Sequence, residues 1–397
     1  MDSDYVGHPG LAEFGETIFA EMSALAARTN ALNLGQGFPD TDGPREVLDA
    51  AAAAMAAGVN QYPPLPGELD LRMAIAEHQR RFWDLTFDPA TEVLVTAGAT
   101  EAIAAALLAF VRPGHEVVMF EPYYDSYAAG VALTGGNRRV VTLRPPEAGE
   151  TGFQFDFDEL RAAVTPKTKV LLLNTPHNPT GKVFTRTELM QIAELALDRD
   201  LLVISDEVYE HLTFDGATHI PIATLPGMAD RTITISSGGK TFSFTGWKVG
   251  WACARPELIA AIRSVKQFLT FVNAAPFQPA IATGLRLGDD YFDDFAATLQ
   301  GKRDRLGAGL EAAGFTVYEP QGAYFTTVDI RPLGFDDGRA FCLALPEMVG
   351  VVAIPSQVFY TNKREGQHLV RFAFCKKDEM LDDAVGRLAR LADRQEK

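Results

Sequence analysis

Residues 201–250 read LLVISDEVYEHLTFDGATHIPIATLPGMADRTITISSGGKTFSFTGWKVG, and two short apolar runs in this stretch end in residues that carry chemistry. The first run, LLVIS, leads into Asp206, and Tyr209 follows three residues later. The second run, TITISS, leads through two glycines to Lys240. Short and nearly continuous apolar runs are typical of strands in a parallel sheet that is covered on both faces. Because open α/β sheets bind ligands at the carboxyl ends of their strands, this stretch predicts a ligand site formed by these three residues.

The same alternation of strands and helices extends upstream of this stretch. The runs VLVT, EVVMFEP and KVLLLN are each followed by a segment with helical character. After about residue 280 the pattern changes to a long helical region over 280–313, several strands and a polar helix. We therefore expect an α/β fold of two domains: an N-terminal arm over 1–44 that joins the small domain, a large domain over 45–280, and a small α+β domain over 281–397.

Composition excludes several classes of function. The chain has 397 residues, 47% of them hydrophobic, which is ordinary for a globular protein with a large core. Its net charge of -16 leaves no basic surface for nucleic acid or for an anionic membrane. No apolar run approaches the roughly 20 residues that span a bilayer. We expect a cytoplasmic protein, because the first residues lack the apolar segment of a secretory signal.

The cysteines and glycine motifs exclude two further kinds of site. Cys253, Cys342 and Cys375 are widely spaced and fit no metal-binding motif, so we expect no metal and interpret the cysteines as buried thiols in a reducing compartment. A nicotinamide dehydrogenase is disfavoured because no GxGxxG motif follows an expected strand.

The residue types in the 201–250 stretch suit pyridoxal phosphate. A carboxylate at Asp206 that faces the pyridine nitrogen would keep this nitrogen protonated, so that the ring could accept the electrons of a bond breaking at the substrate's α-carbon. Tyr209 could donate its hydroxyl to the ring's phenolic oxygen. Taken singly, an Asp here is more often a helix N-cap and a Tyr more often a packed core residue. The combination with Lys240 favours the cofactor.

Lys240 is the candidate nucleophile. Two preceding glycines allow the backbone to approach a ligand, and a lysine shielded from water has a lowered pKa. Most lysines are instead solvated surface residues. The flanking Ser237 and Lys248 reduce the weight of that alternative here, because a hydroxyl and a second cation suit a phosphate group.

A second phosphate-binding element precedes this stretch. VLVTAGATEAIAAALLAF predicts a strand, a small-residue turn and a helix, and the free N–H groups around Gly98, Ala99 and Thr100 would form an anion site at the helix N-terminus. Many such turns bind nothing, so this signal alone is weak.

Two loops after strands offer further groups. In EPYYDSY, either Tyr123 or Tyr124 would stand at the same sheet edge and could stack on the cofactor ring. In NTPHNPTG, the Asn178–Pro179 bond is a candidate cis peptide that would direct the Asn178 amide into the site.

Arg371 lies in the strand LVRFAF, where Val370, Phe372 and Phe374 share the opposite face. If those three face the core, Arg371 is either a surface arginine or a group directed into a cleft. A guanidinium in a cleft could bind a substrate carboxylate with two parallel hydrogen bonds. The strand pattern alone leaves both interpretations open.

Taken together, these segments resemble the class I and II aminotransferases of pyridoxal-phosphate fold type I, over essentially the whole chain. The motifs NPTG, SDEVY and SSGGKTFSFTGWKVGW, in this order and spacing, carry the resemblance. It implies a large domain with a mostly parallel seven-stranded sheet between helices. It also implies a homodimer with shared active sites, in which Tyr62 of NQYPPLPG reaches the phosphate bound by the neighbouring subunit.

The resemblance also implies a role for each site residue. Lys240 would bind the cofactor covalently and move the proton at the substrate's α-carbon, Asp206 would pair with the ring nitrogen, and Tyr124 would stack on the ring. Tyr209 and Asn178 would bind the phenolic oxygen. The phosphate would be held by Gly98, Ala99, Thr100, Ser237 and Lys248, and the substrate's α-carboxylate by Arg371, Gly37 and Asn178.

Within the family the chain is similar to the actinobacterial N-succinyldiaminopimelate aminotransferases and to the kynurenine, glutamine and methionine aminotransferases. Kynurenine enzymes usually carry an aromatic residue where this chain has Thr100 and a His at the position of Val272, which weakens that assignment. We expect transfer between an amino acid and a 2-oxo acid, with glutamate and 2-oxoglutarate as the nitrogen pair, N-succinyldiaminopimelate as the partner and a pocket lined by Phe19, Phe38 and Tyr62.

Two alternatives belong to other classes. A cysteine-conjugate β-lyase would share the cofactor but expel a sulfur leaving group. A non-catalytic cofactor-binding domain of a transcription regulator would carry a basic helix-turn-helix module ahead of it, whereas only about 40 acidic-leaning residues precede the large domain here.

Overall fold

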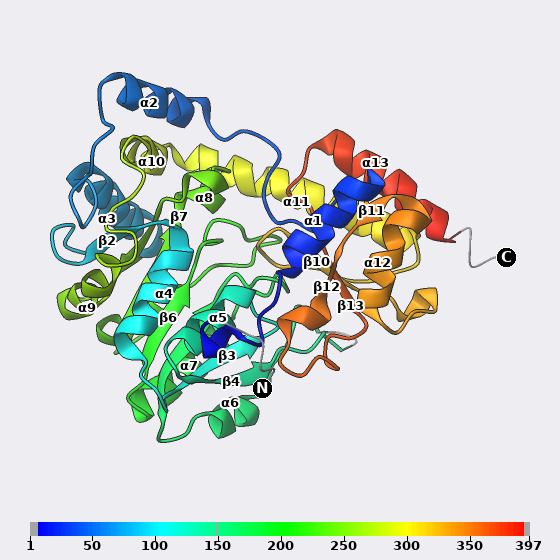
Figure 1. The fold of residues 1–397 in the computed structure, drawn as a ribbon, viewed down its shortest axis with the longest axis horizontal. Helices are drawn as coiled ribbons and strands as arrows, with labels where there is room; N and C mark the ends of the chain where they lie inside the picture. Colours follow the sequence, from blue (N-terminus) through cyan, green and yellow to red (C-terminus); the bar gives the residue numbers. More distant parts are fainter. Residues whose placement is uncertain (1–6, 148–149, 393–397) are drawn as a thin grey trace.

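A seven-stranded sheet forms the centre of the larger part of the molecule (Figure 1). The computed structural model describes residues 7–147 and 150–392. The strand order is β2-β8-β7-β6-β5-β3-β4, and all neighbours are parallel except β8, which is antiparallel to β2 and to β7. The strands are β2 (Val93–Thr96), β3 (Glu116–Glu121), β4 (Asn137–Thr142), β5 (Thr168–Asn174), β6 (Leu202–Asp206), β7 (Thr232–Ser237) and β8 (Gly250–Cys253).

Helices cover both faces of this sheet because its side chains alternate between two apolar cores. Val117 and Met119 point into one core, whereas Val118 and Phe120 point into the other. The first core is shared with α4 (Gly98–Phe110), α5 (Asp125–Leu133) and α9 (Pro256–Lys266). The opposite face packs on α6 (Phe157–Ala163) and α7 (Arg186–Asp198) and, at the β2 end, on α2 (Arg45–Ala56), α3 (Leu69–Trp83) and α10 (Phe277–Leu285). The apolar runs in the sequence are therefore the strands buried on both sides.

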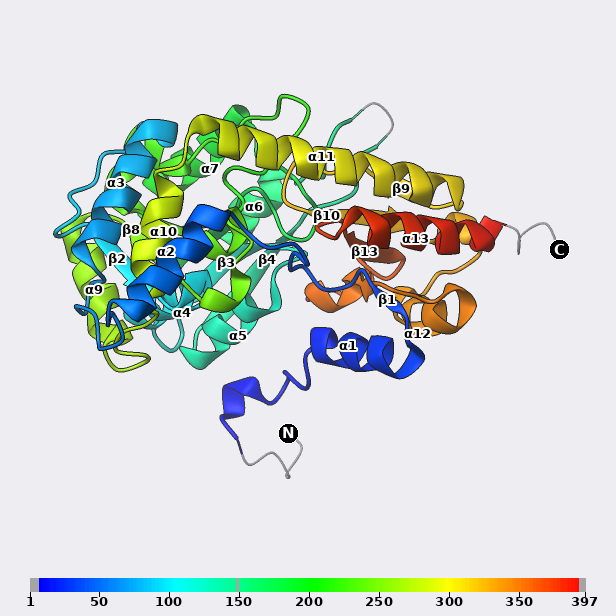
Figure 2. The same ribbon diagram turned by 90° about the horizontal axis from the view of Figure 1, so that it is seen from above.

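A second, antiparallel sheet lies in the smaller part of the molecule, with the order β12-β13-β10-β9. Its strands are β9 (Thr316–Tyr318), β10 (Phe325–Asp329), β12 (Ile354–Pro355) and β13 (Leu369–Ala373). One core joins this sheet to α1 (Ile18–Thr29), α11 (Asp289–Ala312), α12 (Gly338–Val349) and α13 (Asp378–Leu388). β1 (Leu32–Asn33) pairs in parallel with β11 (Val351–Val352), which attaches the N-terminal segment to this part. Figure 2 shows α11 running from one part of the molecule to the other.

The fold agrees with the expected α/β class, and three local features differ from the sequence pattern. The helical region expected over 280–313 is two helices, because α10 ends at Leu285 and α11 begins after Gly288. Strand β4 carries two arginines, which hide its alternation, and β8 was not singled out from the sequence. The division of the chain at residues 44 and 280 stays a prediction; α10, which crosses the second boundary, packs on α2 and α3.

The cysteines agree with the expectation from the sequence. All three cysteines are free and buried. In the described part of the chain, no helix combines the length and the apolar character needed to cross a membrane.

Candidate active site

A cavity of about 350 Å³ opens at the carboxyl edge of the seven-stranded sheet. Strands β6 and β7 end at its floor, and β13 of the smaller sheet supplies one wall. The structure brings together here the following residues that the sequence singled out: Gly37, Gly98, Ala99, Thr100, Tyr124, Asn178, Asp206, Tyr209, Ser237, Lys240, Lys248 and Arg371. The edge rule for parallel strands explains most of this convergence, since most of these residues end or follow the five strands β2, β3, β5, β6 and β7.

Lys240 projects its amine into this cavity from the short helix α8 (Gly238–Thr241). Its Nζ donates to the Tyr324 hydroxyl at 2.8 Å and to the Gly37 carbonyl at 3.3 Å. Burial lowers the pKa of the Lys240 amine to about 8, while the nearby Asp206 carboxylate acts in the opposite direction. A lysine with this pKa has an appreciable neutral fraction near pH 7, which a nucleophile or a base requires.

Asp206 is the last residue of β6 and is buried. One carboxylate oxygen accepts a hydrogen bond from the Tyr127 hydroxyl at 2.6 Å, and the other accepts from the Val208 amide at 3.3 Å. Burial raises the pKa of the Asp206 carboxyl to about 6, and the Tyr127 hydrogen bond opposes that rise. Asp206 is therefore an oriented carboxylate at neutral pH that would gain from a cationic partner.

Two tyrosines flank the space between Asp206 and Lys240. Tyr209 lies under the Lys240 amine, whose nitrogen is 5.7 Å from the ring centroid. Tyr124 packs edge to face on Tyr127, with ring centroids 5.8 Å apart. Of the pair Tyr123 and Tyr124, it is Tyr124 that lines the cavity, whereas the Tyr123 hydroxyl lies 3.1 Å from the Thr361 hydroxyl.

The N-terminus of α4 and Lys248 form a cationic corner of the cavity. Gly98 has φ +74°, and a Cβ at this position would lie 3.1 Å from the Lys248 Nζ. Gly250 allows the close approach, since its own Cβ would lie 2.5 Å from the Gly98 carbonyl carbon. Glycines therefore keep open a space between backbone N–H groups and an ammonium group, and Ser237 borders the same cavity. This arrangement fits a phosphate-sized anion.

Arg371 is 1% exposed, and the other residues of its strand β13 are buried as well. Its guanidinium donates to the Asn178 side-chain oxygen at 3.1 Å and to the Gly35 carbonyl at 2.8 Å, while its Nε has no hydrogen-bond partner. Among the described residues no carboxylate lies within ion-pair distance of it. The Phe325 ring packs against the guanidinium, whose central carbon is 4.0 Å from the ring centroid. A buried, unpaired guanidinium that borders a cavity is suited to an anionic ligand.

Comparison with known proteins identifies the family. The sequence model named "Aminotransferase class I and II" matches residues 29–388. The chain belongs to the class I and II aminotransferases. The protein is thus an enzyme that depends on pyridoxal phosphate.

Two relatives cover nearly the whole chain. A probable N-succinyldiaminopimelate aminotransferase of Mycobacterium tuberculosis is 54% identical over 393 residues, which is 97% of this chain and 98% of that protein. The solved structure of N-succinyldiaminopimelate aminotransferase from the same organism superimposes with a TM-score of 0.95 and 55% identity, over 97% of this chain and 100% of that one. The methionine aminotransferase of Escherichia coli is 39% identical over 96% of this chain and 97% of that protein.

The cavity of this aminotransferase fits its cofactor at both ends. When bound, pyridoxal phosphate supplies an electron sink for a bond broken at the substrate's α-carbon. The cationic corner around Gly98 suits the phosphate, and the Asp206 carboxylate suits a protonated pyridine nitrogen. Lys240 lies between them with an amine that can accept and return a proton. Arg371 lies on the opposite wall, where a substrate carboxylate would meet it.

One residue that the sequence singled out lies elsewhere in the aminotransferase chain. Tyr62 is 82% exposed, does not line the cavity and packs edge to face on Phe271 at 5.6 Å between ring centroids. Of the three residues expected around the specificity pocket, Phe19 and Phe38 line the cavity of this chain, whereas Tyr62 does not, and its expected place in a pocket shared between subunits stays a prediction.

Two residues of the site were missed from the sequence. Tyr127 holds Asp206, and its signal was its position one helical turn after Tyr124 in EPYYDSY. Tyr324 links Lys240 to the N-terminal segment, because its hydroxyl accepts from Lys240 and donates to the Gly37 carbonyl at 2.6 Å. No local pattern marks Tyr324, since its partners lie 84 and 287 residues away.

Proposed function

We propose that this aminotransferase moves an amino group between N-succinyl-LL-2,6-diaminopimelate and 2-oxoglutarate, which gives glutamate and the oxo acid that corresponds to the first compound. It would thereby serve lysine biosynthesis. The observation that supports an amino-acid substrate is the buried Arg371 guanidinium, which has no carboxylate partner among the described residues and lies beside Asn178 in the same cavity as Lys240. The similarity to the Mycobacterium tuberculosis enzyme supports the particular substrate.

The residue roles form part of this proposal. Lys240 binds the cofactor covalently and carries the proton at the α-carbon, and Asp206 pairs with the ring nitrogen. Tyr209 and Asn178 bind the phenolic oxygen, and Tyr124 stacks on the ring. The phosphate is held by Gly98, Ala99, Thr100, Ser237 and Lys248, and the α-carboxylate by Arg371 with Gly37 and Asn178.

The assembly proposed with this function is a cytoplasmic homodimer. Tyr62 and Phe271 form an exposed aromatic pair at one end of the large sheet, next to Phe268, which is 84% exposed. Exposed aromatic groups of this kind favour a protein interface. In the dimer Tyr62 would reach the phosphate bound by the other subunit.

A donor panel tests the substrate. The purified holoenzyme is assayed with 2-oxoglutarate and, in turn, N-succinyldiaminopimelate, kynurenine, glutamine and methionine. We expect the largest kcat/KM with N-succinyldiaminopimelate. Absent turnover with this donor, together with ready use of kynurenine, glutamine or methionine, would assign the chain to the alternative substrates of its relatives. Release of pyruvate from cystathionine without any oxo acid would indicate β-lyase activity.

A separate experiment tests the role of Lys240. Borohydride treatment of the holoenzyme followed by peptide mass spectrometry should place the cofactor on Lys240, and Lys240→Ala should lose both this label and turnover. A label on a different residue would contradict the assignment.

A further inference from the structure

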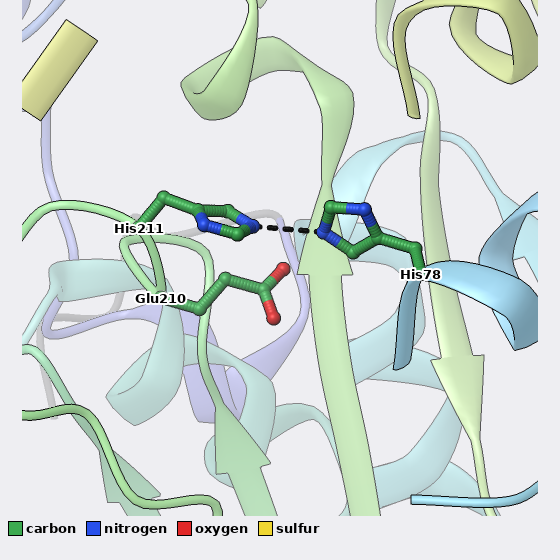
Figure 3. Close-up of side chains that lie close together, drawn as sticks. All are labelled: His78, Glu210 and His211. Atoms are coloured by element: carbon green, nitrogen blue, oxygen red, sulfur yellow. Dashed lines mark hydrogen bonds between the residues drawn. The ribbon is translucent and has the colours of Figure 1, made fainter. Parts of the chain in front are cut away.

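Two histidines and a glutamate lie close together, and none of them lines the catalytic cavity (Figure 3). His78 comes from α3, whereas Glu210 and His211 belong to the turn that follows β6. The His78 Nε2 and His211 Nε2 atoms are 2.8 Å apart, and one ligand atom from each of the three residues lies within 4.8 Å of the others. Figure 3 shows the carboxylate of Glu210 directed at the gap between the two imidazoles.

Outer atoms of His78 and of Glu210 are already held by other residues. The His78 Nδ1 lies 3.4 Å from the Leu285 carbonyl, so it is the nitrogen that donates, and Nε2 keeps its lone pair toward the cluster. One oxygen of Glu210 accepts from the Ser236 hydroxyl at 2.6 Å, and the other accepts from the Gln79 amide at 3.4 Å. Metal-ligating imidazoles and carboxylates are typically oriented by such outer partners.

The surroundings favour neutral imidazoles. The rings of Phe82 and Phe292 lie 4.8 and 4.4 Å from the His211 ring, centroid to centroid. Burial lowers the pKa of His78 to about 4, and it lowers the pKa of His211 as well. The nearest cationic side chain in this shell, Arg81, is bound to Asp289.

Solvent can reach the cluster from one side. His78 also lines a surface depression formed by α3 and the end of α10, which gives a small ion access to the imidazoles. None of the three residues lines the catalytic cavity.

We propose that His78, Glu210 and His211 form a binding site for a divalent transition metal, for which Zn²⁺ is the natural probe. Two imidazole nitrogens and a carboxylate oxygen are a ligand set that Zn²⁺ prefers, with a fourth position left for water. Zn–N distances of about 2.0–2.1 Å place two tetrahedral ligands roughly 3.3 Å apart, so the imidazoles need to separate by only about half an ångström. The ion would replace the proton that the two rings share.

The position of the site gives the metal a structural effect. Glu210 and His211 come directly after Tyr209, in the same turn that follows Asp206, and Ser236 comes directly before Ser237. A metal here would fasten α3 to the turn that carries the groups beneath the cofactor. This inference does not depend on which amino donor the enzyme uses.

Metal analysis of the holoenzyme tests the site. The protein is treated with a chelator, dialysed against Zn²⁺ and then against buffer, and its zinc content is measured by mass spectrometry. We expect one Zn²⁺ per chain, and loss of this ion in His211→Gln. His115→Gln is the matched control, because it removes an imidazole of the surface turn before β3 and leaves the cluster intact. A wild-type protein without bound zinc, or equal zinc content in both variants, would overturn the proposal.

Two further measurements use the unmodified chain, so they do not depend on folding of a variant. Co²⁺ should give the visible absorption of a low-coordinate site with nitrogen ligands, and Zn²⁺ should abolish this absorption. Zn²⁺ should also slow hydrogen exchange of the 207–212 amides. Absence of the Co²⁺ band would show that the two imidazoles form a hydrogen bond only, and unchanged exchange would refute the fastening of the turn.

Discussion

The Tyr324 hydroxyl should raise the pKa of Lys240, in opposition to the larger lowering that burial causes. This hydroxyl donates to the Gly37 carbonyl, so its lone pair faces the Lys240 amine at 2.8 Å. A hydrogen bond to a charged group contributes about 1.5–3 kcal/mol. Because one pKa unit corresponds to about 1.4 kcal/mol, Tyr324→Phe should lower the pKa of Lys240 by roughly 1–2 units below its value of about 8.

The assay is competitive acylation of the apoenzyme, with the label on Lys240 followed by peptide mass spectrometry between pH 5 and 11. The wild-type midpoint should lie at about 8. At pH 7 the neutral fraction is then roughly 230 times that of an ordinary lysine with a pKa near 10.4. The direction of the shift also means that the folded apoenzyme gains stability as the pH rises from about 8 toward 10, because there the unfolded chain binds more protons.

Tyr291→Phe is the matched control for this experiment. The Tyr291 hydroxyl donates to the carbonyl of Thr241, the residue after Lys240, but it does not contact the amine. The Lys240 midpoint should therefore stay near 8 in this variant. An unchanged midpoint in Tyr324→Phe, or an equal shift in Tyr291→Phe, would refute the reasoning.

Three further variants test the walls of the cavity. Arg371→Lys keeps the positive charge but loses the two parallel N–H donors of the guanidinium, so kcat/KM for the amino donor should fall by about 10–100-fold. An amine that lacks the α-carboxylate should show little change. Equal losses for both substrates would contradict carboxylate binding. Gly98→Ala should weaken cofactor affinity in equilibrium titration, because residue 98 has φ +74° and the new Cβ would lie 3.1 Å from the Lys248 Nζ. Gly58→Ala is the control: residue 58 has φ +86° but its new Cβ would meet no atom within 4 Å, so the affinity should stay unchanged. Tyr127→Phe removes a hydrogen bond to Asp206 worth about 1.5–3 kcal/mol and should weaken cofactor binding roughly 10-fold. Tyr123→Phe is the control, because the Tyr123 hydroxyl contacts Thr361 and not Asp206. Similar cofactor affinities in the two variants would contradict the role of Tyr127.

The cofactor-facing floor of the site could be predicted from the sequence because it is encoded locally. Asp206 directly follows one apolar run, and Lys240 follows another after two glycines. The spacing of apolar residues that distinguishes strands from helices is visible within single segments of the chain. Parallel strands bring their carboxyl ends to one edge, so the chain order of the strands was enough to place these groups together. The same local reasoning placed the turn at Gly98, where only a residue without a Cβ leaves the space open.

Tertiary packing alone decided the remaining walls. Both faces of β13 are buried, so alternation along that strand could not tell whether Arg371 faces solvent or a cleft. Its partner Asn178 lies 193 residues away, and the contact depends on how the smaller sheet packs against the larger one. Tyr324 and the pairing of His78 with His211 depend on the same kind of distant contact. The sequence by itself determined the strand ends and the chemistry they carry, because periodicity and backbone conformation are local properties. Which distant side chains meet was decided only by the tertiary structure, because it depends on packing between elements that no single segment encodes.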